Sequence, residues 1–292
     1  MPRPVTLHIN ETLVHLMREI SGEQAALIGA DPQEAYQNYY LDIASHFRAL
    51  YPVGAGLGID DSMSVLEVGS GIGTRCLLGT GLFGAQFTGV EPCANSYAML
   101  GRAIQEMKEA NRPLDYRYLN KSGENTGLPS ESFDIILSFE VMEHVNSPEQ
   151  VLKEMYRLLK PGGKLFLSTC NYDSFYEGHY RCLWLPFLND PLRNAYIRMR
   201  GYNCGFLKEL NFLTKRRLMQ SLDLAGFTRI APWRRCQAPP APELRVVFPE
   251  GYAPKPGRLR KSLASDLVQN RTVNAFLSRF DREYKLYVEA SK

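Results

Sequence analysis

The chain has 292 residues, of which 45% are hydrophobic and 22% are charged. These proportions are typical of a globular protein and argue against a disordered or fibrous chain. No apolar run approaches the roughly 20 residues that span a bilayer, and the amino terminus lacks the pattern of a signal peptide. The six cysteines form no C-x-x-C pair and no zinc-type spacing. We therefore expect reduced thiols and a cytoplasmic location.

The net charge of +3 conceals an asymmetry between the two halves of the chain. Residues 1–150 carry 9 basic and 19 acidic side chains, whereas residues 151–292 carry 25 and 12. A basic half can attract an anionic small molecule, a membrane surface or a nucleic acid. It is equally compatible with a solvated surface that has no preferred partner.

Apolar runs and helical patterns alternate along residues 62–171. The predicted strands are 63–68, 84–92, 115–120, 132–139 and 164–170, and the predicted helices are 94–112 and 148–160. Strands that alternate with helices across short loops require right-handed crossovers and a mostly parallel sheet. The predicted fold is therefore a doubly wound, Rossmann-like α/β sheet with helices on both faces.

Further elements flank this alternating region. An amphipathic helix at 31–50 is assigned to an N-terminal helical cap, residues 1–55, ahead of the main domain, residues 56–292. After the fifth strand we expect an insertion at about 171–213, a helix at 213–227, a strand at 227–233 and a helical insertion at about 237–283. Residues 285–292 predict a last strand, which we expect to be antiparallel to the others.

The first predicted strand ends in the turn Glu67-Val68-Gly69-Ser70-Gly71-Ile72-Gly73-Thr74. Its G-x-G-x-G spacing differs from that of a dinucleotide-binding turn, and the carboxylate of Glu67 would repel a pyrophosphate. Glu91, at the end of the second strand, is placed to accept hydrogen bonds from both hydroxyls of a ribose. The indicated ligand has a ribose, no phosphate and a positive end. S-adenosylmethionine meets all three conditions.

Together with this turn, the segments SFEVMEHV (138–145) and LLKPGGKLFLST (158–169) resemble those of class I S-adenosylmethionine-dependent methyltransferases. The resemblance is greatest to the group that includes ubiquinone-biosynthesis and other small-molecule methyltransferases, and it covers about residues 62–172. It implies a cofactor site made of Glu67, Gly69, Ser70, Gly71, Gly73, Thr74, Glu91, Pro92, Glu124, Asn125, Ser138 and Phe139.

The resemblance also implies a role for each part of that set. The acidic residue and glycines of the turn would surround the methionine moiety, and Glu91 would hold the ribose. Glu124 and Asn125 would flank the adenine, although many relatives have Asp in place of Glu124. Ser138 and Phe139 would line the sulfonium side.

Methyl transfer from a sulfonium needs the nucleophile, the methyl group and the sulfur in line, and a hydroxyl acceptor usually needs a general base. His179, close to Glu177 in sequence, is the first candidate for that base. His144 is a second, with a structural role in its loop as the alternative. No carboxylate–histidine cluster with metal-ligand spacing is evident, so no metal is expected. The candidate acceptor-binding residues, for which simple packing is the alternative, are Tyr39, Tyr40, Tyr176, Tyr180 and Trp184.

The leading functional hypothesis is a methyltransferase that acts on an oxygen or nitrogen of a small molecule, such as a metabolite, natural product or saccharide. An anionic acceptor would suit the basic half of the chain, and a homodimer is compatible with the sequence. One alternative is an RNA-modifying methyltransferase, although no base-holding motif or RNA-binding appendage is recognisable and no stable nucleic-acid partner is expected. The other is a non-catalytic binding protein with a methyltransferase fold. A dehydrogenase is disfavoured by Glu67 and the glycine spacing.

Overall fold

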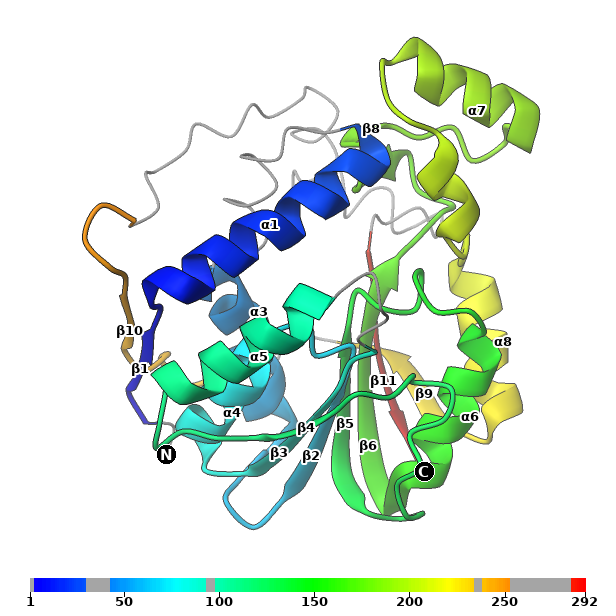
Figure 1. The fold of residues 1–292 in the computed structure, drawn as a ribbon. Coiled ribbons are helices and arrows are strands. Elements are labelled where there is room, and N and C mark those ends of the chain that lie inside the picture. Colours follow the sequence, from blue (N-terminus) through cyan, green and yellow to red (C-terminus); the bar gives the residue numbers. More distant parts are fainter. Residues whose placement is uncertain (1–2, 30–42, 93–97, 234–237, 253–284) are drawn as a thin grey trace.

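A seven-stranded sheet forms the centre of the computed structural model, which describes residues 3–29, 43–92, 98–233, 238–252 and 285–292 (Figure 1). Its strand order is β4-β3-β2-β5-β6-β11-β9. The strands are β2 (Ser64–Val68), β3 (Gln86–Val90), β4 (Arg117–Leu119), β5 (Phe133–Phe139), β6 (Leu159–Cys170), β9 (Thr228–Pro232) and β11 (Lys285–Ser291). Strands β2 to β6 are parallel, whereas β11 is antiparallel to both of its neighbours. The predicted doubly wound sheet with an antiparallel last strand is confirmed.

Alternate side chains of the central strands enter two separate cores. Val65 and Leu137 belong to one apolar cluster, and Leu66 and Ile136 belong to the other. Because successive side chains point to opposite faces, strands that are apolar throughout must be covered on both sides. Figure 1 shows α3 (Ile43–Leu57), α4 (Thr74–Phe83) and α5 (Ala98–Ala110) on one face, and α6 (Pro148–Leu158) and α8 (Lys215–Ala225) on the other.

The N-terminal segment is joined to the sheet domain by both of its elements. Strand β1 (Val5–His8) pairs in parallel with β10 (Leu244–Val247), and α1 (Glu11–Ile28) packs against α5. Asn10 begins α1, because its side chain accepts a hydrogen bond from the backbone N–H of Leu13 at 2.8 Å.

Residues 171–213 form the predicted insertion between β6 and α8. It contains a short hairpin, β7 (Tyr176–Glu177) and β8 (Cys182–Leu183), then α7 (Asp190–Met199) and the 3₁₀ helix η3 (Gly205–Glu209). Figure 1 shows α7 standing out from the body of the molecule. The end of α1 reaches this insertion, where the backbone N–H of Asn203 donates to the carbonyl of Ile28 at 3.2 Å.

Three sequence-based boundaries need revision. The helix expected at 31–50 is α3, which begins at Ile43, and residues 30–42 lie outside the described part. The described part of the expected helical insertion at 237–283 contains strand β10, because that segment supplies the partner for β1. The N-terminal cap of residues 1–55 likewise contains a strand and is not wholly helical. None of the helices in the described residues is both long and apolar enough to cross a membrane.

Asn111 provides a test of how firmly the N-terminal strand is attached. Its side-chain oxygen accepts from the backbone N–H of His8 at 2.7 Å, and its amide donates to the carbonyls of His8 and Met107 at 3.0 and 2.8 Å. We expect Asn111→Ala to lower the free energy of unfolding by about 1–3 kcal/mol, because it leaves backbone groups of β1 without partners. Urea denaturation measures the change. Gln105→Ala, on the exposed side of α5 just before Asn111, is the control, and an equal effect of both variants would contradict the assignment.

Candidate active site

The glycine turn after β2 is held in a conformation that other residues rarely adopt. Gly69, Gly71 and Gly73 have φ of 76°, 53° and 83°. A Cβ on Gly73 would lie 1.9 Å from the hydroxyl of Tyr116, so that glycine is also required by packing. A Cβ on Gly71 would meet nothing within 4 Å. The turn is therefore closed on one side and open at Gly71, where a ligand can approach the backbone.

Glu91 lies against this open part of the turn. The backbone N–H of Gly71 donates to Glu91 Oε2 at 3.0 Å, which joins the ends of the neighbouring strands β2 and β3. Burial and, to a smaller extent, the nearby charge of Glu67 raise the pKa of Glu91 to about 7. The hydrogen bond from Gly71 opposes this rise. Further hydrogen-bond donors, in addition to the backbone N–H of Gly71, would therefore stabilise the charged form of this carboxylate.

Glu67, on β2, is buried and paired with a residue that the sequence interpretation did not include. Arg75, in the first turn of α4, places Nη1 3.3 Å from Glu67 Oε1, and the Cys76 thiol lies 3.1 Å from Oε2. The guanidinium also lies 4.6 Å from the ring centre of Phe139. The buried Nε of Arg75 has no hydrogen-bond partner among the described residues. The turn therefore presents a pair of opposite charges rather than a lone carboxylate.

The other candidate cofactor residues differ in their burial and in their hydrogen-bond partners. Ser70 and Ser138 are buried with hydroxyls that have no partner among the described residues, and Thr74 is buried at the start of α4. Glu124 is instead engaged by its own loop, since it accepts from the backbone N–H groups of Asn146 and Ser147 at 2.9 and 3.2 Å and from the hydroxyl of Ser122. The exposed candidates are Pro92 and Asn125.

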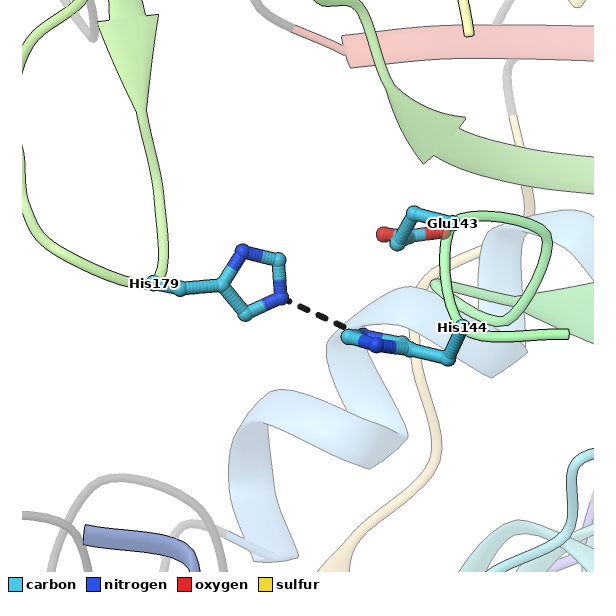
Figure 2. Close-up of side chains that lie close together, drawn as sticks. All are labelled: Glu143, His144 and His179. Atoms are coloured by element: carbon cyan, nitrogen blue, oxygen red, sulfur yellow. Dashed lines mark hydrogen bonds between the residues drawn. The ribbon is translucent and has the colours of Figure 1, made fainter. Parts of the chain in front are cut away.

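The structure brings the two candidate catalytic histidines together, although they are 35 residues apart in sequence. His144 lies in the loop after β5 and His179 in the turn of the β7–β8 hairpin, and their Nε2 atoms are 3.2 Å apart (Figure 2). Nδ1 of His179 lies 2.6 Å from Oε1 of buried Glu177. Burial lowers the pKa of His179, but the charges of Glu177, Glu143 and Glu140 outweigh it, and the net shift is upward.

Glu143 completes this cluster from the same loop as His144 (Figure 2). Its Oε2 accepts from the hydroxyl of Thr169 at 2.7 Å, while its buried Oε1 has no partner among the described residues. Burial and the neighbouring carboxylate of Glu140 raise the pKa of Glu143. The charge of Glu140 is balanced by Lys285, whose Nζ is 2.7 Å away.

The aromatic candidates for acceptor binding form the core of the insertion. Tyr176, Tyr180 and Trp184 are all at least 95% buried, and the last two use their polar atoms internally. The hydroxyl of Tyr180 donates to the carbonyl of Asn203 at 2.8 Å, and the indole of Trp184 donates to that of Tyr172 at 3.1 Å. Their geometry matches the packing alternative. Tyr39 and Tyr40 lie outside the described residues.

Comparison with known proteins identifies the part of the chain that contains the carboxyl ends of β2, β3 and β5. Residues 66–167 match the family model described as "Methyltransferase domain". This match agrees with the resemblance of the same segments to class I S-adenosylmethionine-dependent methyltransferases, and residues 66–167 are called the methyltransferase domain below. It includes the glycine turn, Glu91 and the loop with Glu143 and His144.

Relatives of the methyltransferase domain match only part of their own length. The chain is 32% identical over 145 residues to a ubiquinone biosynthesis O-methyltransferase of Pseudomonas putida, which is 47% of this chain and 60% of the relative. It is also 38% identical over 109 residues to a ubiquinone biosynthesis O-methyltransferase of Dechloromonas aromatica. That match covers 37% of this chain and 44% of the relative. A solved S-adenosylmethionine dependent methyltransferase from Mesorhizobium loti is 16% identical over 85% of this chain and 96% of that chain, with a TM-score of 0.49.

The sequence interpretation missed three residues that the geometry of the methyltransferase domain and its insertion makes prominent. Arg75 follows Glu67 by eight residues, and helical spacing after the turn could have suggested that the two meet. Glu143 stands in the segment EVMEHV, beside a histidine that was considered alone. Glu140 lies in the same segment, and no sequence signal links it to Lys285 near the carboxyl terminus.

The raised pKa of Glu91 predicts a pH-dependent stability of the ligand-free protein. The ordinary pKa of 4.5 applies to the unfolded chain and the value of about 7 to the folded one. Stability is therefore lost as pH rises from 4.5 to 7, because the folded state disfavours ionisation. We expect Glu91→Gln to be more stable than wild type at pH 8 and equal to it below pH 4.5. Thermal unfolding across this range measures the difference, and exposed Glu109→Gln should follow wild type throughout.

Proposed function

We propose that the protein transfers a methyl group from S-adenosylmethionine to an oxygen or nitrogen of a small molecule. The observation that carries the proposal is the contact between Glu91 and the open side of the glycine turn at Gly71. It puts a carboxylate and an accessible backbone at the carboxyl edge of a doubly wound sheet, where ligands bind in such folds. Residues 66–167, which contain both groups, form the methyltransferase domain.

The described residues fit each part of S-adenosylmethionine that they face. Glu91 would accept from the two hydroxyls of the ribose, which supplies the hydrogen bonds its buried carboxylate needs. The methionine moiety carries an ammonium and a carboxylate, and Glu67 and Arg75 offer the opposite charge to each. The unpartnered hydroxyls of Ser70 and Ser138 lie on the strand ends and turn that border this site.

Methyl transfer is a single displacement. A lone pair of the acceptor oxygen or nitrogen attacks the methyl carbon, the bond from that carbon to sulfur breaks, and its electron pair stays on sulfur to give the thioether S-adenosylhomocysteine. The proton of the acceptor must leave to a base. Nε2 of His179 is suited to receive it, because Glu177 accepts from Nδ1 and stabilises the imidazolium that forms.

Two observations favour a hydroxyl acceptor within this proposal. The matched relatives from Pseudomonas putida and Dechloromonas aromatica are named O-methyltransferases. In addition, the histidine with a raised pKa is a stronger base than an ordinary imidazole, which suits removal of a proton from an alcohol or phenol.

Ligand binding tests the cofactor assignment directly. We expect isothermal titration calorimetry to detect S-adenosylmethionine and S-adenosylhomocysteine and to detect no NADH. Glu91→Ala should weaken cofactor binding at least about tenfold, because hydrogen bonds to a charged group contribute about 1.5–3 kcal/mol. Glu109→Ala is the exposed control. Binding of NADH in preference to S-adenosylmethionine would overturn the proposed function.

Turnover tests the base. Incubation with methyl-labelled cofactor and fractionated metabolites, followed by mass spectrometry, identifies the acceptor. With that acceptor, we expect His179→Ala to lower turnover by at least about tenfold, within the usual range for a general base, while cofactor affinity stays unchanged. Turnover equal to wild type would remove His179 from the mechanism and leave the cofactor assignment in place.

A further inference from the structure

We propose that Glu143, His144 and His179 form a binding site for a divalent first-row transition-metal cation. The three residues come from two segments that meet only in the fold, the loop after β5 and the turn of the β7–β8 hairpin (Figure 2). The site itself depends only on these side chains. Its use in methyl transfer rests on the proposed function.

The distances suit a shared ion. One potential ligand atom from each residue lies within 4.8 Å of the others. The Nε2 atoms of His144 and His179 are 3.2 Å apart. If each were about 2.1 Å from a common ion, they would subtend an angle of about 100° at it, which lies between octahedral and tetrahedral values.

Glu143 supplies an independent indication of a missing positive charge. It is fully buried, yet its Oε1 has no hydrogen-bond partner among the described residues. An unpaired buried carboxylate oxygen is costly, and the nearby carboxylate of Glu140 increases that cost. Lys285 is already bound to Glu140, so its charge is directed to that residue. A cation between Glu143 and the two histidines would stabilise the carboxylate.

The surroundings orient the ring of His179 so that one nitrogen is left for a metal. Nδ1 of His179 donates to Glu177, whose other oxygen accepts from the backbone N–H of Tyr180 at 2.6 Å. In that tautomer the lone pair of His179 is on Nε2, which faces His144. Metal-binding histidines commonly donate their second N–H to a carboxylate in this way.

His144 faces His179 across the site, with its Nε2 3.2 Å from that of His179. The loop that carries His144 is fixed to the insertion by Asn211. Its backbone N–H donates to the carbonyl of Glu143 at 2.8 Å, and its side-chain amide donates to that of Val145.

Two imidazole nitrogens and one carboxylate favour Mn²⁺, Co²⁺ or Zn²⁺ over Ca²⁺, which prefers oxygen ligands throughout. Three protein ligands leave coordination positions open for a water or a substrate oxygen. A hydroxyl acceptor bound there would lose its proton more easily, because a cation lowers the pKa of a coordinated oxygen. In that case Nε2 of His179 would hold the ion, and the proton of the acceptor would pass to solvent water.

Metal binding can be measured without any activity. The full chain is stripped with a chelator, and binding of Mn²⁺, Co²⁺ and Zn²⁺ is followed by equilibrium dialysis with elemental analysis and by the visible spectrum of Co²⁺. We expect about one equivalent of at least one of these ions, and a loss of affinity of at least about tenfold in both His144→Ala and His179→Ala. His8→Ala, which removes an exposed histidine of β1, should bind like wild type.

A further variant and measurements of cofactor affinity distinguish loss of the metal site from loss of the folded structure. Glu177→Gln keeps all three ligands and should weaken metal binding by a smaller factor than either histidine variant. S-adenosylmethionine affinity, measured on the same preparations, reports whether each variant is folded. Absence of stoichiometric binding, or equal binding by wild type and both histidine variants, would overturn the metal site while leaving the cofactor assignment intact. Metal binding by a protein that does not bind S-adenosylmethionine would support the metal site and overturn the cofactor assignment.

Discussion

The parallel pairing of β2 with β3 and β5 is the constraint on which the site depends. Strands that are buried on both faces leave room for polar groups only where they end. Because parallel strands end at the same edge, Gly71, Glu91 and Ser138 are collected there from three separate strand ends. The contact of Glu91 with Gly71 follows from this register. A shift of one residue in either strand would turn these groups toward the opposite face.

Charge at this edge is organised in two separate places. Glu67 is neutralised within the fold by Arg75, and Glu140 by Lys285. Among the described residues, no lysine or arginine forms an ion pair with Glu91 or Glu143. Both carboxyl groups have raised pKa values, as does Glu67, and perturbed groups of this kind concentrate at functional sites. Glu91 lies against the glycine turn, and Glu143 lies beside two histidines.

The insertion stabilises itself and positions one catalytic candidate. Its aromatic residues, including Trp184 and Tyr180, bury one another and satisfy their polar atoms within the segment. This core, which also includes Cys170 at the end of β6, supports the β7–β8 hairpin that carries His179 and Glu177. Asn211 then fixes the returning chain to the loop that carries His144. The large aromatic side chains therefore serve the site indirectly, by fixing the hairpin.

The alternating apolar runs determined the sheet, its helices and the glycine turn, because hydrophobic periodicity and glycine spacing are local properties of the chain. The same reasoning could not show that β10 pairs with β1, since such pairing depends on which distant segment reaches an open strand edge. Nor could it show that His179 meets His144 beside Glu143. Sequence distance hides these encounters. Only the folding of the insertion over the carboxyl edge of the sheet brings the side chains within a few ångströms of one another.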